Sequence, residues 1–214
     1  MVGTVGVFLA TCIRAENTRG EFENQAFSTY TEARMVITKQ GESYFRIQNG
    51  EIVLLIDPTN QRSVRGADII LNTKTQTEPG EGLIIDHPGE YEIKGIRVQG
   101  TAANEEGETI YRIRWDDITI GILGGVSKEP EAKSQLGLQG VDVLILPAGG
   151  KNIPASIAAK IVRQAEPSLV IPWGDTKAFT KEMGSSPETT ENKLTFKKKD
   201  LNPKAMKVSL LSEN

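Results

Sequence analysis

The segment 67–82, ADIILNTKTQTEPGEG, joins an apolar strand to a polar loop that carries Lys74, Gln76 and Glu78. Polar side chains delivered together at the end of a strand are typical of binding and catalytic loops. The loop contains no histidine and no cysteine, so it lacks the usual metal ligands and nucleophile–base pairs. A lysine beside carboxylates can form a structural ion pair, bind a ligand or, when buried with a lowered pKa, act as a base or nucleophile.

The whole chain is equally poor in metal ligands. Its 214 residues include one cysteine, Cys12, and one histidine, His87. Protein zinc sites use three or four ligands, mostly cysteine and histidine, so these counts argue against an ordinary zinc site and exclude an intramolecular disulfide framework. His87 precedes a Pro-Gly turn, and the sequence identifies no partner for it. We therefore predict a surface or turn residue rather than a catalytic one.

Charge and hydropathy give no sign of a nucleic-acid or membrane partner. Lysine and arginine number 25 against 28 aspartate and glutamate, for a net charge of −3. The basic run KLTFKKKD, 193–200, alternates like a solvated strand, and its lysines discourage edge-to-edge pairing. The apolar run 2–13 is shorter than the roughly 20 residues of a membrane span, and no lysine or arginine precedes it as in a signal peptide. We expect a cytoplasmic protein.

The first two-thirds of the chain is predicted to be rich in β-strands. Alternating or continuous apolar patterns indicate strands at 35–40, 43–48, 51–57, 67–72, 82–100 and 108–123, with hairpin turns at Asn49–Gly50 and Asp116–Asp117. After Gly125 helices appear, at 127–138 with Ser127 as N-cap, at 153–167 and at 176–184. Strands at 141–147, 168–172, 193–200 and 205–211 complete the pattern, which predicts sheets covered by helices.

These residues carry a family resemblance. Six segments follow one another in an order and spacing that are fairly specific together. They are MVITKQGESYFRIQNGEIVLLIDP, ADIILNT, PGEYEIKGIRVQG, VDVLILPAGG, AAKIVRQAEPSLVIPW and KLTFKKKDL. From about Met35 to the C-terminus the chain resembles the small, stand-alone bacterial Zn-dependent hydrolase-like branch of the metallo-β-lactamase superfamily. The resemblance implies an α/β fold, a four-layer αββα sandwich over residues 35–214, preceded by an extension at 1–34.

The resemblance also implies a metal site whose ligands this chain lacks. Family members carry H-x-H-x-D-H on the loop after the "AD" strand, a later H-x-G-D and a histidine after "IP", which hold metal ions that supply hydroxide. The matched positions are Lys74, Gln76, Glu78, Pro79, Ile122, Gly125 and Gly174. Lysine has no lone pair to offer, and isoleucine and glycine cannot coordinate through side chains. Only Glu78 could bind a metal, so we predict that the zinc chemistry is lost and that no cofactor is used.

The former metal pocket could keep a structural or binding role. Asp57, in "IDP", matches a residue that supports the ligand loop in relatives. Lys74, Gln76, Glu78 and Asp175 are expected near the pocket mouth, where the lysine and two carboxylates would form an ion-pair cluster that replaces the metal's charge. Glycines in GILGGVSK could leave backbone N–H groups at Gly124, Gly125 and Ser127 for an anion. Because phosphate-loop spacing is absent, we favour a plain strand-to-helix turn.

Two hypotheses about function follow. In the first, the chain is a catalytically inactive, metal-free member that serves as a binding, scaffold or oligomerisation module, through an unknown protein partner or self-association. In the second, it is a hydrolase of the superfamily with a non-standard or metal-independent site. The absence of the expected ligand types at the matched positions favours the first hypothesis.

Overall fold

The computed structural model describes residues 34–59, 64–75, 83–185 and 190–213. The chain divides into two compact units, Met1–Thr31 and Glu32–Asn214, and all described residues belong to the second. The expected extension therefore lies almost entirely outside the described residues. Among the helices described, none has the length and apolar character needed to cross a membrane.

The first sheet has six strands in the order β13-β1-β2-β3-β4-β5. Strands β1 (Met35–Lys39), β2 (Phe45–Asn49) and β3 (Ile52–Ile56) form an antiparallel meander, with the β2–β3 turn at Gly50 as expected. Strands β4 (Ile69–Leu71) and β5 (Ile84–Ile85) continue the sheet in parallel, and β13 (Leu194–Phe196) pairs antiparallel with β1 at the other edge.

The second sheet has seven strands in the order β14-β11-β10-β9-β8-β7-β6. Strands β6 (Gly89–Ile93), β7 (Ile96–Ala102), β8 (Thr109–Trp115) and β9 (Ile118–Ile122) are antiparallel. Strands β10 (Val143–Ala148), β11 (Leu169–Gly174) and β14 (Lys207–Val208) are parallel. A separate pair joins β12 (Thr190–Glu191) to β15 (Leu210–Leu211), and a short 3-10 turn, η1, covers Lys198–Asp200.

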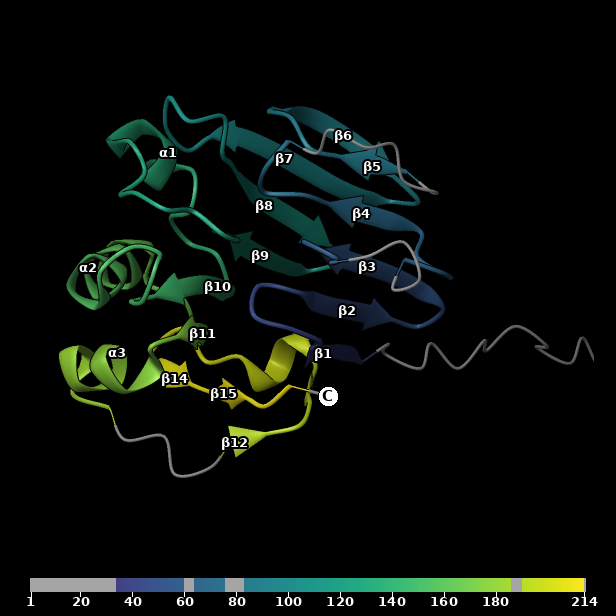
Figure 1. The fold of residues 1–214 in the computed structure, drawn as a ribbon. Coiled ribbons are helices and arrows are strands. Elements are labelled where there is room, and N and C mark those ends of the chain that lie inside the picture. Colours follow the sequence, from purple (N-terminus) through teal and green to yellow (C-terminus); the bar gives the residue numbers. More distant parts are fainter. Residues whose placement is uncertain (1–33, 60–63, 76–82, 186–189, 214) are drawn as a thin grey trace, which may run out of the picture. The chain divides into compact units, whose positions relative to one another are not determined.

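The two sheets face each other across the main core. Alternate residues of both sheets, such as Ile37, Ile47, Ile113 and Ile120, are fully buried between them. A second core lies between the outer face of the second sheet and the helices α2 (Ala155–Ala165) and α3 (Thr176–Met183), which Figure 1 shows beside β10 and β11. The short helix α1 (Ala132–Leu136) contributes no residue to this core. The outer face of the first sheet carries a small apolar cluster that includes Tyr44, Val53, Leu55 and Ile70. The predicted α/β sandwich is confirmed.

Two predicted boundaries are wrong. The strand expected at 193–200 ends at Phe196, and η1 follows it at Lys198–Asp200. Helix α1 begins at Ala132 with Glu131 as N-cap, not at Ser127. The backbone N–H and the hydroxyl of Ser127 instead bond to the carboxylate of Glu108. The Ser127 hydroxyl is thus directed to Glu108 and not to the backbone N–H groups two or three residues ahead, from which an N-cap oxygen accepts.

The ends of several strands meet at one edge of the sandwich. The backbone N–H of Asp57, after β3, bonds to the carbonyl of Leu71 at the end of β4. Two residues further on, the carbonyl of Thr73 accepts from Thr109 N at 2.8 Å, which links the first sheet to β8 of the second. Loops that leave strand ends at such an edge commonly carry functional side chains.

Candidate functional site

Asp57 holds the start of the loop that follows β4. Its carboxylate accepts from the backbone N–H and from the hydroxyl of Thr73, both at 2.7 Å. Burial raises the pKa of Asp57 to about 6, although the bonds from Thr73 and the nearby Lys74 charge act in the opposite direction. Asp57 also has a positive φ of 46°. The side chain thus fixes Thr73 at the start of the loop.

Glu108 is the buried carboxylate next to Lys74. Its side chain is 4% exposed, and Lys74 Nζ lies 3.1 Å from its Oε1. Asn104 Nδ2 donates to Glu108 at 2.8 Å, Ser127 N at 3.0 Å and Ser127 Oγ at 2.9 Å. Burial raises the pKa of Glu108, but the bonds from Asn104, Ser127 and Lys74 outweigh it, so the pKa lies below its ordinary value. Glu108 is therefore ionised at neutral pH, with its acceptor positions occupied.

The turn after β9 is engaged by these same residues. Gly125 N donates to Thr73 Oγ1 at 3.0 Å, and Ser127 N donates to Glu108. Gly124 has φ +54°, and a Cβ atom built on it would lie 1.9 Å from Thr73 Cγ2. The glycine is required here because the turn passes directly over a buried threonine. The backbone N–H of Ser127, where the sequence left room for a bound anion, thus bonds to the carboxylate of Glu108 in the same chain.

A cavity of about 590 Å³ opens beside this network. It is bordered by Trp173 of β11 and by twelve residues of the loops between the strands: Glu42, Ser43, Asp57, Pro58, Thr59, Thr73, Lys74, Thr75, Gly125, Ser127, Lys151 and Asn152. The volume falls in the usual range for small-molecule sites. We call it the pocket from here on.

The structure brings together only some of the predicted site residues. Asp57, Lys74, Gly125 and Ser127 border the pocket. Asp175 instead caps α3, where Oδ1 accepts from Ala178 N at 3.2 Å, and it is not among the residues that border the pocket. Gly174 has φ +91°, and Ile122 is fully buried in the core. Gln76, Glu78 and Pro79 lie outside the described residues.

Several residues of the site were not singled out in the sequence, among them Thr73, Glu108, Lys151 and Trp173. Glu108 stands at the start of a strand in the other sheet, so nothing local connects it with Lys74. Lys151 follows two glycines after the strand expected at 141–147, and Trp173 lies one residue beyond the strand expected at 168–172. His87 is exposed, with Nδ1 2.5 Å from Oδ1 of the adjacent Asp86, consistent with a surface residue.

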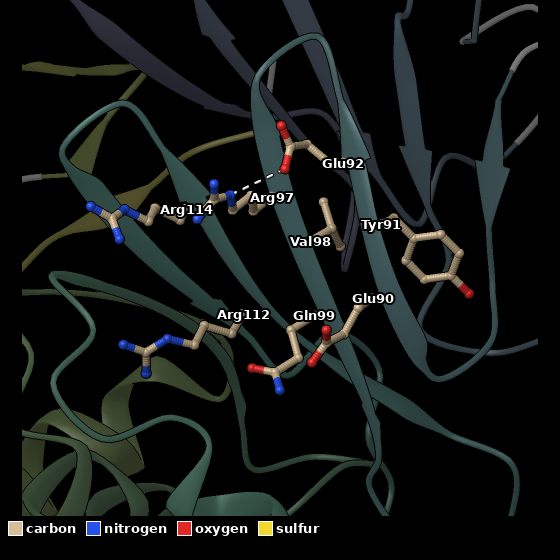
Figure 2. A pocket seen from close by; sticks show the side chains of 8 residues that line it. All are labelled: Glu90, Tyr91, Glu92, Arg97, Val98, Gln99, Arg112 and Arg114. Carbon is tan, nitrogen blue, oxygen red and sulfur yellow. Dashed lines mark hydrogen bonds and ion pairs between the residues drawn. The ribbon is translucent and has the colours of Figure 1, made fainter.

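A second cavity, of about 490 Å³, lies on the second sheet over β6, β7 and β8. Figure 2 shows Glu92 bonded to Arg97 and the side chains of Arg112 and Arg114 extending side by side from β8. Arg112 donates to the carbonyls of Gly137 and Gln139, at 2.9 and 2.8 Å. We call this surface the arginine face. It carries three guanidinium groups but no strongly buried charge.

The described residues do not fit the zinc ion that the resemblance implies. They contain no group of three or more histidine, cysteine, aspartate or glutamate side chains placed to hold a metal. Of the matched ligand positions that are described, one is a cation, one an isoleucine and two are glycines. The donor chemistry of zinc needs lone pairs that these side chains do not offer.

Comparison with known proteins identifies the family. The model of the Beta-lactamase superfamily domain matches residues 36–173. A putative Zn-dependent hydrolase of the metallo-β-lactamase superfamily from Thermotoga maritima superposes with a TM-score of 0.72 at 21% identity, over 84% of this chain and all of that one. A metallo hydrolase from Ignicoccus hospitalis gives a TM-score of 0.60 at 16% identity, over 77% of this chain and 99% of that one.

A third solved structure, the metallo-β-lactamase fold protein YhfI from Bacillus subtilis, gives a TM-score of 0.60 at 10% identity, over 85% of this chain and 98% of that one. The three TM-scores establish a shared fold. No curated protein matches the sequence. Because the family model covers well over half of the sequence and the sandwich agrees, this chain belongs to the beta-lactamase superfamily domain family.

Proposed function

We propose that this chain is a metal-free, non-hydrolytic member of its family that retains the pocket as a binding module. The observation that supports the proposal best is the ion pair between Lys74 and the buried Glu108. Lys74 stands where the family pattern has its first ligand histidine. A fixed ammonium charge at that position takes the place of the positive charge that a metal would bring.

The electrostatics of this pair oppose metal binding. A divalent ion near Lys74 would be repelled by the ammonium group, and solvent screens part of this repulsion because the Lys74 side chain is 59% exposed. Glu108 cannot easily serve as a ligand, because it already accepts from Asn104, Ser127 and Lys74. To bind a metal it would have to leave these donors without an acceptor in a buried place.

The metal-independent hydrolase has weaker support. The hydroxyl of Thr73 is buried, donates to Asp57 and accepts from Gly125 N, so it is not available as a nucleophile. Ser127 Oγ donates to Glu108, whose lowered pKa makes it a weak general base. His87 pairs with Asp86 and is not among the residues that border the pocket.

The direct test is the metal content of protein purified without an affinity tag or chelator, measured by plasma mass spectrometry. We expect zinc and iron well below one equivalent. A thermal melt recorded with and without added zinc should show no shift of the midpoint, because a ligand that binds only the folded state would raise it. Copurification of about one equivalent of metal, with a midpoint raised by zinc, would contradict the proposal.

The matched variant is Lys74→Ala, because it removes the ammonium charge and leaves Glu108 in place. If the lysine is what opposes metal binding, zinc should shift the melt of this variant more than that of the parent. Lys133→Ala, on the exposed side of α1, removes an equal charge away from the pocket and serves as the control. A scaffold or oligomerisation role stays a prediction, checked by light scattering of the eluting protein.

A further inference from the structure

We infer that the arginine face binds a second copy of this chain, so that the two faces meet around a twofold axis close to β7. The inference goes beyond the proposed function, because no residue that borders the arginine face also borders the pocket. It depends on how the strand register orders the charged side chains, and it holds whether or not the pocket binds a metal.

The charges of the arginine face are sorted by strand. Side chains on one face of a sheet come from alternate residues of each strand, in rows that the register sets. Two rows cross β6, β7 and β8 in that order: the first holds Glu92, Arg97 and Arg114, and the second Glu90, Gln99 and Arg112. Figure 2 shows both rows, with the glutamates at one side and the arginines of β8 at the other. The face thus has an acidic edge on β6 and a basic side on β8.

Most of these charges have no partner of opposite sign in the described part of the chain. The exception is the pair of Glu92 and Arg97, at 3.2 Å. Glu90 and Arg114 are exposed and make no ion pair with a described residue. Arg112 donates to two backbone carbonyls rather than to a carboxylate. The arginines of β8 therefore carry positive charge that no described carboxylate matches.

A twofold axis along β7 brings the acidic edge of each copy over the basic side of the other. Because the axis lies on the middle strand, β6 of one copy is opposite β8 of its partner, and positions along the strands are kept. Glu92 of each copy then faces Arg114 of the other, and Glu90 of each faces Arg112 of the other. On the axis, Gln99 meets its own copy, and an amide both donates and accepts. Arg97 also meets its own copy, with its charge matched by Glu92.

The outer face of the second sheet has the shape that such a contact needs. A Cβ atom built on Gly121 of β9 would lie 3.0 Å from Leu138 Cδ2, so the segment after α1 already covers β9. Helices α2 and α3 cover the strands beyond it. Over β6, β7 and β8 the long side chains are instead exposed and enclose the cavity of about 490 Å³. The uncovered half of one copy would therefore lie beside the helices of the other rather than on them.

Salt dependence distinguishes this contact from association that ignores position. The chain has a net charge of −3, so two copies repel each other overall, and salt would favour a contact without matched charges. Matched charges behave in the opposite way. We expect a weak dimer, because the face is small, and we expect its dissociation constant to rise at least tenfold in about 1 M salt, where the screening length is about 3 Å. The measurement is sedimentation equilibrium of the full chain over a series of concentrations at low and high salt.

Variants with reversed charges test the twofold arrangement. Arg114→Glu and Glu92→Lys should each weaken the dimer at least tenfold, because each places like charges opposite one another. Lys181→Glu, on the exposed surface of α3, makes the same change of charge as Arg114→Glu and should leave the dimer unchanged. Urea melts establish that the variants are folded, as expected for exposed positions. Arg114→Ala, which introduces no like charge, should weaken the dimer by a smaller factor.

Two mixtures then test the register. An equal mixture of the Arg114→Glu and Glu92→Lys variants restores every opposite-charge contact, so the two should form a heterodimer. A mixture of the Arg114→Glu and Glu90→Lys variants carries the same charges in the wrong rows and leaves like charges facing each other. The second mixture should therefore associate at least tenfold more weakly than the first.

The remaining outcomes overturn the inference. A parent chain that stays monomeric at every concentration has no such interface. A dimer that survives Arg114→Glu, or that strengthens with salt, uses another surface of the chain. Equal association in the two mixtures shows that opposite charges attract without the register set by β6, β7 and β8. The metal content that tests the proposed function has no bearing on any of these results.

Discussion

The pocket and the arginine face are cavities of similar size, about 590 and 490 Å³, and both contain ion pairs. They differ in what lies beneath the charges. In the pocket, Glu108 is 4% exposed at its side chain and is paired with Lys74. On the arginine face, Glu92 is 63% exposed and is paired with Arg97 at 3.2 Å. The comparison shows that the burial of the carboxylate, rather than the presence of an ion pair, decides how strongly the fold depends on each site.

The energetic reason is the cost of removing a carboxylate from water. An exposed pair gains little, since solvent screens it and its side chains lose entropy. A buried carboxylate must keep its partners, because each lost donor leaves a desolvated charge. Substitutions near the pocket should therefore have large effects, whereas matched ones near the arginine face should have small ones.

The largest expected effect is that of Gly124→Ala. The new Cβ would lie 1.9 Å from the side chain of Thr73 at a φ of +54°, so the turn or the threonine must move. We expect a loss of about 4 kcal/mol in the free energy of unfolding, measured by urea denaturation. Gly95→Ala, in the β6–β7 turn, is the control: its φ is +78° and its Cβ meets nothing within 4 Å. Gly95→Ala should lower the free energy of unfolding by about 1 kcal/mol. Equal losses in the two variants would remove the distinction between the pocket and the arginine face.

Next in size is the loss of the buried carboxylate. Glu108→Ala removes the acceptor of Asn104, Ser127 and Lys74, and should lower the free energy of unfolding by about 3 kcal/mol. Glu92→Ala breaks an ion pair of the same type on the arginine face and should change it by no more than about 0.5 kcal/mol. The measurement is a pair of urea melts at neutral pH. If Glu92→Ala lowers the free energy of unfolding as much as Glu108→Ala, the exposure of the carboxylate does not decide how much it contributes to stability.

The smallest effect concerns pH and Asp57. Folding raises the pKa of this carboxyl from 3.8 to about 6, so the folded state binds its proton more tightly. The associated stability is fully present below pH 3.8 and is lost as the pH rises towards 6. Relative to Asp57→Asn, the parent should lose about 2 kcal/mol between pH 4 and 7, measured by urea melts at each pH. A difference that stays constant with pH, or grows, would contradict the prediction.

Glu108 provides an internal check on the sign. Its pKa lies below the ordinary value, so its contribution is present at neutral pH and is lost as the pH falls. The two carboxylates therefore act in opposite directions over the acidic range. Subtracting the Asp57→Asn curve from that of the parent removes the contribution of Glu108 and isolates that of Asp57.

The fold could be predicted from the sequence because each strand has a recognisable local pattern of residues. Apolar alternation and the Asn49–Gly50 turn mark the first hairpin without tertiary information, and the order of the motifs identified the family. The ion-pair partner of Lys74 could not be found in this way. We expected Glu78 and Asp175, but the described partner is Glu108, from a strand of the opposite sheet. Only the packing of the two sheets brings these residues together.

The misplaced start of α1 has a similar origin. Ser127 followed by acidic residues is a good local signal for a helix N-terminus. An N-cap serine must direct its hydroxyl oxygen to backbone N–H groups ahead of it, and the Ser127 hydroxyl is directed instead to Glu108, which lies outside the segment. Local rules fail here because the deciding group is remote in sequence.

The Lys74–Glu108 pair also has an evolutionary consequence. Returning Lys74 to histidine would not restore a metal site by itself, because Gly125 and Gly174 would still offer no side-chain ligand. The step would, however, deprive the buried Glu108 of its fixed positive partner at neutral pH. The first reversal would thus lower stability before any metal affinity was regained. Under the proposed function, the pair would therefore oppose the regain of a metal site through single substitutions.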